Sequence, residues 1–380
     1  MQTSSIELAS EDALRLHVLL AGDVEAIRID ESRMMVLGLT RQGEAAVQLH
    51  PTCRNQQYLS KVREVLAGHS LGSPGGYPIH LKRWTRMGQA RDKGLDRLLL
   101  LGEPEAVVSV AYSNGLTDEL ARRAWWAMPA ADNARRMLER ECVVQGKMGK
   151  ILAEYLIEHL PFETEPHTIM DTVRIVLQPG LTDEAARLRL WNRGRHDSAH
   201  YVGFLERMPD TLPIERPGRD DSLALQTKLA PLLNEDNPYA QQLLRTLSGP
   251  GQAFLHISEK VLRSAADRDV VLALLNAVAA YFCHGLDTDL TRQAGKEIDS
   301  ILAKVEACCT DNSNPALKKL LTHAPGYGAE MRAILALSCM NAEVALPILA
   351  LTTAGGTVMH KKLQPVIVPI TQLFAVLTKS

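Results

Sequence analysis

The chain has 380 residues, of which 46% are hydrophobic and 23% charged, so it is long enough for two or three domains with cores of their own. Its net charge of −2 excludes a general attraction of the whole molecule to nucleic acid or to a membrane surface. Aromatic residues make up only 4%, so the core must consist mainly of leucine, alanine, valine and isoleucine, a mixture that favours packed helices.

Neither the N-terminal segment nor the most apolar region predicts export or membrane insertion. The first residues, MQTSSIELASEDALRLH, contain no basic residue before Arg15, unlike a secretory signal. The most apolar region, 333–353, is interrupted by Asn341, Glu343 and Pro347, which argues against a membrane span. We therefore expect a cytoplasmic protein whose six cysteines are reduced.

Residues 1–95 predict a small α+β domain. Ser10 is expected to cap a helix that runs from Glu11 to about Leu20. Another helix is expected over Asn55–Ala67, and a final strand over Ile79–Trp84. Between the two helices, three short apolar runs with polar breaks predict an antiparallel meander: Val24–Ile29, Arg33–Leu39 and Ala45–Leu49.

The segment Gly68-His69-Ser70-Leu71-Gly72 matches the G-x-S-x-G pattern of a hydrolase nucleophile elbow. That turn needs a strand before the serine and a helix after it. Here a helix is expected before the serine, and the four glycines and two prolines of Gly68–Pro78 predict a loop. We therefore interpret the match as a glycine-rich loop and not as a catalytic site.

The strongest local charge lies between His50 and Arg97, where nine lysines and arginines face only three acidic residues. A basic stretch with one exposed aromatic side chain can neutralise phosphates and stack a base. The candidate binding residues are the following: Lys82, Arg83, Trp84, Arg86 and Arg91. Two further basic clusters lie at Arg187, Arg189, Arg193 and Arg195, with His196 and His200 nearby, and at Arg135, Arg136 and Arg140. The alternative is that all three are ordinary solvated surface, or that their arginines pair with the acidic remainder of the chain.

An internal repeat dominates residues 96–215, which we expect to form a helical repeat domain. Gly115-Leu116-Thr117-Asp118-Glu119 recurs 65 residues later as Gly180-Leu181-Thr182-Asp183-Glu184, and 11 of 27 aligned positions are identical. In each copy, glycine is expected to end one helix and threonine to cap the next. Trp126 and Trp191 align near the end of that helix, and Asp132 and Asp197 are expected to cap a third. The pattern predicts a mostly α fold with stacked three-helix, solenoid-like units.

Pro209, Pro213, Pro217 and Gly218 then predict a linker, after which residues 216–380 are expected to form an all-helical C-terminal domain. Asn314-Pro315 is a typical helix start within it.

No residue pattern in the chain predicts a metal site or a cofactor. The six cysteines include no Cys-x-x-Cys and no zinc-like spacing, and no phosphate-binding or dinucleotide fingerprint is present. Cys308 and Cys309 are adjacent and could form a sulfur-handling or redox site, which would require an exposed thiolate of low pKa. The alternative is that they are small, partly buried residues of a helix.

Three segments carry a resemblance to a known family: HLKRWTRMGQARD (His80–Asp92), GLTDELARRAWW (Gly115–Trp126) and LPFETEP (Leu160–Pro166). They resemble the DsrS family of sulfur-oxidising bacteria, over about residues 10–215. The resemblance implies a cytoplasmic accessory of dissimilatory sulfur oxidation without established catalytic residues, acting in the control of gene expression. Together with the repeats, it predicts a non-enzymatic protein that binds a protein or RNA partner.

Overall fold

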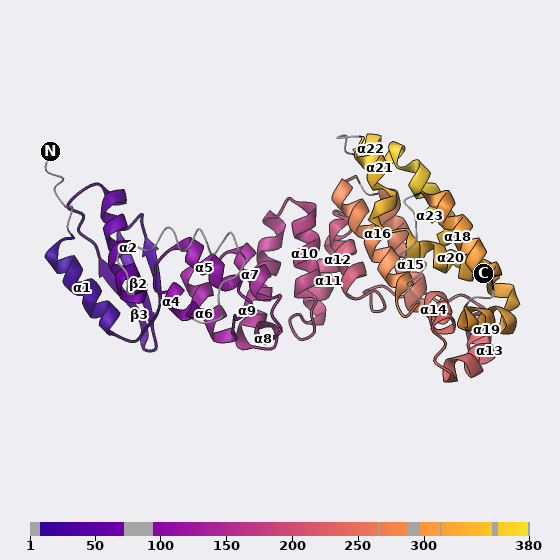
Figure 1. Cartoon of the computed structure of the whole chain (residues 1–380), viewed down its shortest axis with the longest axis horizontal. Helices are drawn as coiled ribbons and strands as arrows, with labels where there is room; N and C mark the ends of the chain where they lie inside the picture. The colour runs from indigo at the N-terminus through magenta and orange to yellow at the C-terminus, as the bar shows by residue number, and fades with distance from the viewer. Residues whose placement is uncertain are drawn as a thin grey trace. The chain divides into compact units, whose positions relative to one another are not determined.

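The computed structural model describes residues 8–71, 94–264, 266–286, 297–311, 314–351 and 356–378. These residues are mostly helical, and their strands form a three-stranded antiparallel sheet near the N-terminus (Figure 1). The mostly α fold with a small N-terminal α+β region is therefore confirmed. The solenoid-like stacking of repeats stays a prediction.

The chain divides into two compact units. Unit 1 consists of Met1–Pro161 with Gln178–Thr182, and unit 2 of Phe162–Leu177 with Asp183–Ser380. This division is coarser than the three domains expected from the sequence. It also places almost all of the second repeat copy in a different unit from the first.

Unit 1 begins with a helix, the sheet and a second helix: α1 (Ser10–Ala21), β1 (Val24–Asp30), β2 (Met35–Thr40), β3 (Gly43–Gln48) and α2 (Asn55–Leu71). It continues with short helices: α4 (Leu95–Leu98), α5 (Pro104–Ala111), α6 (Asp118–Ala127), α7 (Ala131–Met137), α8 (Glu141–Val144) and α9 (Lys147–His159). A 3-10 turn, η1 (Leu160–Phe162), follows.

The predicted meander is confirmed, with β2 in the middle of the sheet. Val36 of β2 pairs with Ile29 on one side and Val47 on the other. One face of the sheet packs against α1 and α2, and the core of this layer is formed by the following residues: Leu16, Leu19, Leu20, Ile27, Met34, Val36, Val47, Leu49, Tyr58, Leu59, Val62 and Leu66. Because successive side chains of a strand point to opposite faces of the sheet, the alternating apolar residues all lie on the face that packs against the helices.

Three local expectations for this region differ from the structure or lie outside it. α1 begins at Ser10 and the residue before it, Ala9, makes no side-chain cap, so the predicted Ser10 cap is wrong. α2 continues to Leu71, so Gly68 does not begin a loop. The predicted strand over Ile79–Trp84 lies outside the described residues.

The two repeat copies share a first helix but cap it differently. Thr117 caps α6 by accepting a hydrogen bond from the Leu120 amide at 3.2 Å. In the second copy, Asp183 caps α11 (Glu184–Arg193) by accepting from the Ala186 amide at 2.7 Å. Gly180 has the expected left-handed backbone, with φ of +83°, whereas its counterpart Gly115 does not have a positive φ.

The copies diverge further along the chain. Trp126 lies against the Arg28 guanidinium, whereas Trp191 is buried among aromatic rings. The first copy continues into α7 and α8, and Asp132 does not cap α7. The second copy continues into α12 (Ala199–Arg207), with Asp197 accepting from the Ala199 amide, and residues 208–221, all described, contain no third helix.

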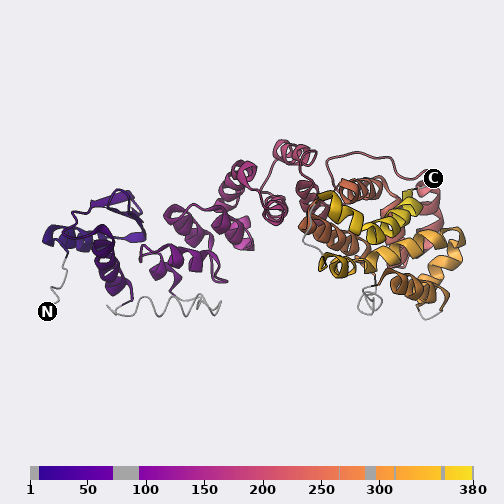
Figure 2. The same ribbon diagram turned by 90° about the horizontal axis from the view of Figure 1, so that it is seen from above.

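Unit 2 is a helical assembly, seen from above in Figure 2 in pink, orange and yellow. Besides α11 and α12 it contains α10 (Pro166–Val176), α13 (Ser222–Asn234), α14 (Pro238–Leu247), α15 (Gly249–Ser264), α16 (Arg268–Cys283) and α18 (Ile298–Thr310). The chain ends with α19 (Pro315–His323), η2 (Pro325–Tyr327), α20 (Gly328–Cys339), η3 (Ala342–Val344), α21 (Leu346–Leu349), α22 (Gly356–Lys362) and α23 (Gln364–Thr378).

Two predictions in this unit concern places where helices end or begin: the linker after α12 and the helix start at Asn314. Residues 208–221 break the helical pattern, but Arg219 is buried and pairs with Asp221 and with Glu330 of α20. This segment therefore packs within unit 2. Asn314 caps α19 by accepting from the amides of Ala316 and Leu317, as Asn-Pro predicted.

Candidate functional site

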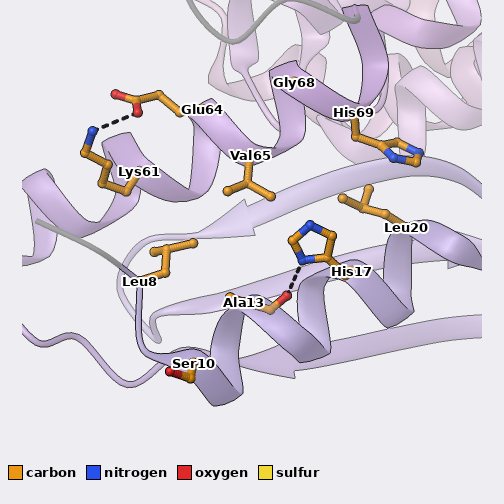
Figure 3. Close-up of a pocket in the computed structure, with 10 residues that line it drawn as sticks. All are labelled: Leu8, Ser10, Ala13, His17, Leu20, Lys61, Glu64, Val65, Gly68 and His69. Atoms are coloured by element: carbon orange, nitrogen blue, oxygen red, sulfur yellow. Dashed lines mark hydrogen bonds and ion pairs between the residues drawn. The ribbon is translucent and has the colours of Figure 1, made fainter. Parts of the chain in front are cut away.

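A groove of about 910 Å³ lies between α1 and α2 on unit 1 (Figure 3). Its apolar lining comes from Leu8, Ala13, Leu20, Val65 and Gly68. Gly68 lies on the part of α2 that lines this groove. A Cβ added at Gly68 would meet no atom of the described residues within 4 Å.

Polar side chains stand around this apolar lining without filling it. Lys61 and Glu64 pair with each other at 2.8 Å on α2 (Figure 3). The Nδ1–H of His17 donates to the carbonyl of Ala13, one turn earlier on α1, at 2.6 Å. His69 lies in the last turn of α2 and also lines the groove. The rim can therefore offer both a cation and an anion to a ligand that fills the apolar floor.

Helix α1 adds exposed apolar surface beside the groove. Leu14 and Val18 are 65% and 66% exposed, and one helical turn separates them. They follow directly after the groove residues Ala13 and His17 in the sequence, so they lie on a neighbouring strip of the same helix. A groove with an adjoining apolar strip is typical of a surface that binds an amphipathic helix.

A buried carboxylate fixes the two helices that form the groove. The Asp12 carboxylate accepts from the Tyr58 hydroxyl of α2 at 2.5 Å and from the His50 amide at 2.6 Å. It also pairs with Nδ1 of the exposed His50 ring at 2.9 Å. The Tyr58 hydroxyl accepts in turn from the amide of Ala9, which lies between two residues that line the groove. The network therefore sets the position of α1 against α2.

The hydrogen bonds of this network favour the ionised form of Asp12. Burial opposes ionisation, but the His50 amide, the Tyr58 hydroxyl and the His50 ring outweigh it and lower the pKa of Asp12 below its usual value. Burial and the adjacent Asp12 raise the pKa of Tyr58 to about 12. Tyr58 thus stays a protonated donor at physiological pH, and the network serves to position the helices.

The candidate binding residues Lys82, Arg83, Trp84, Arg86 and Arg91 lie outside the described residues. Their role stays a prediction from the sequence.

The other two basic clusters have different surroundings. Arg135 and Arg136 pair with Asp132 and Glu139, and Arg140 donates to the carbonyl of Tyr112, so this cluster is held by contacts within unit 1. In the cluster on and after α11, Arg187 has an interaction partner. Arg189, Arg193 and Arg195 form no ion pair within the part of the chain that the structure describes.

The thiols of Cys308 and Cys309 lie near the end of α18 and are partly buried. Burial, reinforced by Asp311, raises the pKa of Cys308 above its usual value. Burial and the neighbouring Cys308 raise the pKa of Cys309 to about 11. Both groups are therefore protonated thiols near neutral pH, which disfavours the thiolate that a sulfur-handling role would require.

Ser70 lies inside α2 and not at a turn between a strand and a helix. Its hydroxyl is buried. A nucleophile elbow presents its serine on a sharp exposed turn after a strand. The helical backbone at Ser70 thus agrees with setting aside the hydrolase motif.

Comparison of the chain with protein-family profiles, curated proteins and solved structures finds no match. Among the described helices, none combines the length and the apolar character needed to cross a membrane. The described residues also contain no group of three or more histidine, cysteine or acidic side chains arranged to hold a metal ion.

The groove was not predicted from the sequence. Its two walls come from helices separated by a whole sheet, and nothing local in either helix specifies how they meet. The one available signal was Leu14 and Val18, apolar residues on a different face of α1 from the core residues Leu16 and Leu20.

Proposed function

We propose that this protein is a non-enzymatic binding protein that holds a segment of a macromolecular partner in the groove between α1 and α2. The observation that carries the proposal is the open apolar groove flanked by the exposed Leu14 and Val18. A protein helix with apolar residues on one face fits this surface better than RNA, because a nucleic acid strand presents charged phosphates.

The biological setting of this proposal comes from the resemblance to the DsrS family, which suggests an accessory role in dissimilatory sulfur oxidation in the cytoplasm. The predicted helical-repeat surface and the basic residues Lys82, Arg83, Trp84, Arg86 and Arg91 remain candidate contacts in addition to the groove. The thiol alternative at Cys308 and Cys309 gains no support from their raised pKa values.

Gly68 allows the groove to be closed without disturbing the core. Because a Cβ there meets no atom within 4 Å among the residues that the structure describes, Gly68→Trp should fill the groove while the protein stays folded. Gly68→Ala is the matched control, since it removes the same helix-interior glycine but leaves the groove open. Alanine is favoured over glycine in a helix interior by about 1 kcal/mol, and tryptophan is also a better helix former than glycine, so neither variant should unfold more readily than the natural chain.

The test is affinity capture from sulfur-oxidising cells grown on reduced sulfur, with bound protein and RNA both identified. We expect the natural chain and Gly68→Ala to retain the same protein partner and Gly68→Trp to lose it. Equal capture by all three would show that the groove is not the contact. Retention of RNA alone would show that the partner belongs to the other class.

A further inference from the structure

Three basic side chains lie near one another on unit 2, far along the chain from the groove. Arg216 lies in the helix-free segment 208–221, and His256 and Lys260 lie one turn apart on α15. Nη2 of Arg216 donates to Nε2 of His256 at 2.7 Å. Nζ of Lys260 donates to the Tyr201 hydroxyl of α12 at 3.3 Å and lies 4.7 Å from the centre of that ring.

These cations lack the carboxylate partners that most of the arginines described by the structure have. Arg122, Arg219 and Arg245, for example, each pair with an acidic side chain. Within the residues that the structure describes, neither Arg216 nor Lys260 forms an ion pair. Glu259, the acidic residue beside Lys260, is paired with Arg263 on the same helix.

The positive charges of Arg216 and Lys260 both act on the His256 ring. Burial lowers the pKa of His256, and the positive charges of Arg216 and Lys260 lower it further, while Glu259 offsets this only in part. The ring is therefore neutral near physiological pH, and accepting from Arg216 at Nε2 places its proton on Nδ1. An unneutralised positive field of this kind attracts an anion.

The basic surface continues toward the end of α11. The Tyr201 ring packs against Trp191 with ring centres 4.6 Å apart, and a Cβ at Gly194 would lie 2.5 Å from the Tyr201 ring. Tyr201 thus links Lys260 to the end of α11, where Arg195 and His196 are exposed. α12 and α15 pack together within this unit and hold these groups in place (Figure 1).

We propose that Arg216, His256 and Lys260 form a binding site for a phosphate-type oxyanion, free or carried on a nucleic acid strand. A guanidinium group, an ammonium group and an imidazole N–H are all donors to the same kind of acceptor. A tetrahedral oxyanion has enough oxygen atoms to accept from all three and supplies the missing negative charge. The proposal does not depend on the α1–α2 groove, because it rests on other residues in the other unit.

Two probes distinguish the sources of the oxyanion: inorganic phosphate, and a 12-nucleotide oligouridylate. Binding to the full-length chain is followed by the NMR signals of the His256 ring and, for the oligonucleotide, by fluorescence anisotropy at several salt concentrations. We expect phosphate to shift the His256 signals. If the oligonucleotide binds through the same site, we expect phosphate to compete with it.

The double variant Arg216→Ala/Lys260→Ala removes both charges from exposed side chains, so it should fold normally. It should weaken binding of the probe by at least about tenfold at low salt and reduce the salt dependence of oligonucleotide binding by about two ions. Lys228→Ala removes a charge from an exposed side chain of α13, away from α15, and is the matched control, with little change expected.

Each result decides the question. Binding of phosphate alone, lost in the double variant, supports a site for a free anion, and loss of oligonucleotide binding supports a strand. Equal binding by the natural chain and the double variant overturns the proposal and points to another basic stretch, which Lys82→Ala/Arg83→Ala/Arg86→Ala would test. No binding of either probe at low salt also overturns it. The partner capture with Gly68→Trp is unaffected by all of these outcomes.

Discussion

Two buried tyrosines differ in the hydrogen bonding of their hydroxyl groups, and this difference determines how much each hydroxyl contributes to stability. The Tyr58 hydroxyl donates to the carboxylate of Asp12, whereas the Tyr281 hydroxyl is buried without a hydrogen-bond partner in the described part of the chain. A hydrogen bond to a charged group contributes about 1.5–3 kcal/mol, while an unpaired buried hydroxyl contributes nothing favourable. We expect Tyr58→Phe to lower the free energy of unfolding by about 2 kcal/mol and Tyr281→Phe to leave it unchanged or raise it.

The comparison isolates the hydroxyl because both rings should stay in place. The Tyr281 ring is held between Phe254, at 3.9 Å between ring centres, and the guanidinium of Arg245, at 3.9 Å from the ring centre. Phenylalanine keeps both contacts. Urea unfolding of the two variants measures the difference, and similar losses in both would contradict this account.

His200 predicts a loss of stability in mild acid. It is only 5% exposed on α12, and neither ring nitrogen has a hydrogen-bond partner among the described residues. Burial and the charge of Arg193 lower the pKa of His200 below its usual 6.5, although Asp197 acts in the opposite direction. The unfolded chain therefore takes up this proton more readily than the folded one, and stability falls as the pH drops below about 6.5.

Below that pH, the unfavourable burial of this charge should reduce the free energy of unfolding by up to about 1.4 kcal/mol per pH unit. Replacing His200 with Gln should make the stability curve flatter between pH 5 and 7 than that of the natural chain. His196→Gln, at an exposed position on the same segment, is the control and should leave the slope unchanged. If His200→Gln retains the full slope, another group causes it.

At the scale of whole elements, Asp118 shows how one residue can serve a helix other than its own. Its carboxylate accepts from the amides of Lys147 and Met148, both at 3.0 Å, at the start of α9. Gly146 makes this approach possible, because a Cβ there would lie 2.2 Å from the carboxylate. Asp118→Ala should therefore destabilise α9 by about 0.5–2 kcal/mol.

Hydrogen exchange tests this prediction directly, because the amides of Lys147 and Met148 should lose protection in Asp118→Ala. Asp183→Ala, at the aligned position of the second copy, should instead expose the amide of Ala186 at the start of α11. The same substitution at two aligned positions would then affect different helices. In the first copy it would affect α9, which begins well after α6, and in the second copy it would affect α11, the helix that directly follows Asp183. Loss of protection at the start of α6 alone in Asp118→Ala would contradict the assignment.

Elements with a strong local pattern could be predicted, and those that depend on distant partners could not. The strands of the meander and the start of α19 at Asn314-Pro315 have signals within a few residues. The cap that Asp118 provides for α9 joins segments far apart in the sequence. Asp183, the identical residue in the second copy, instead caps α11, which follows it directly. The extension of α2 through Gly68 also overrides a glycine that locally favours a break.

At the scale of the whole molecule, contacts cross the boundary that the sequence predicted at residue 95. The amide of Ile27 in β1 donates to the carbonyl of Leu99 at 2.8 Å, and Glu25 of β1 pairs with Arg122 and Arg123 of α6. The sequence pattern becomes helical from Asp96 onward, which is why a boundary was expected there. The groups that join the sheet to the following helices are single charged or apolar residues with no distinctive spacing.

The chain also passes more than once between the two units, and this predicts which variants affect which unit. Leu181 is buried in unit 1, where it would touch a Cβ placed on Gly149 of α9 at 3.0 Å. Val173, only a short way before it, packs in unit 2, where it lies 2.7 Å from the position of a Cβ on Gly203 of α12. Neighbours in sequence thus belong to different cores.

Leu181→Ala should therefore weaken unit 1 by about 2–5 kcal/mol, the usual effect of emptying a buried leucine site. Hydrogen exchange in the full-length chain should then increase in α9, while α12 keeps its protection. Val173→Ala should produce the reverse pattern, because its lost contacts are with α12. If both variants increase exchange in the same helices, the assignment of Gln178–Thr182 to unit 1 and Phe162–Leu177 to unit 2 is wrong.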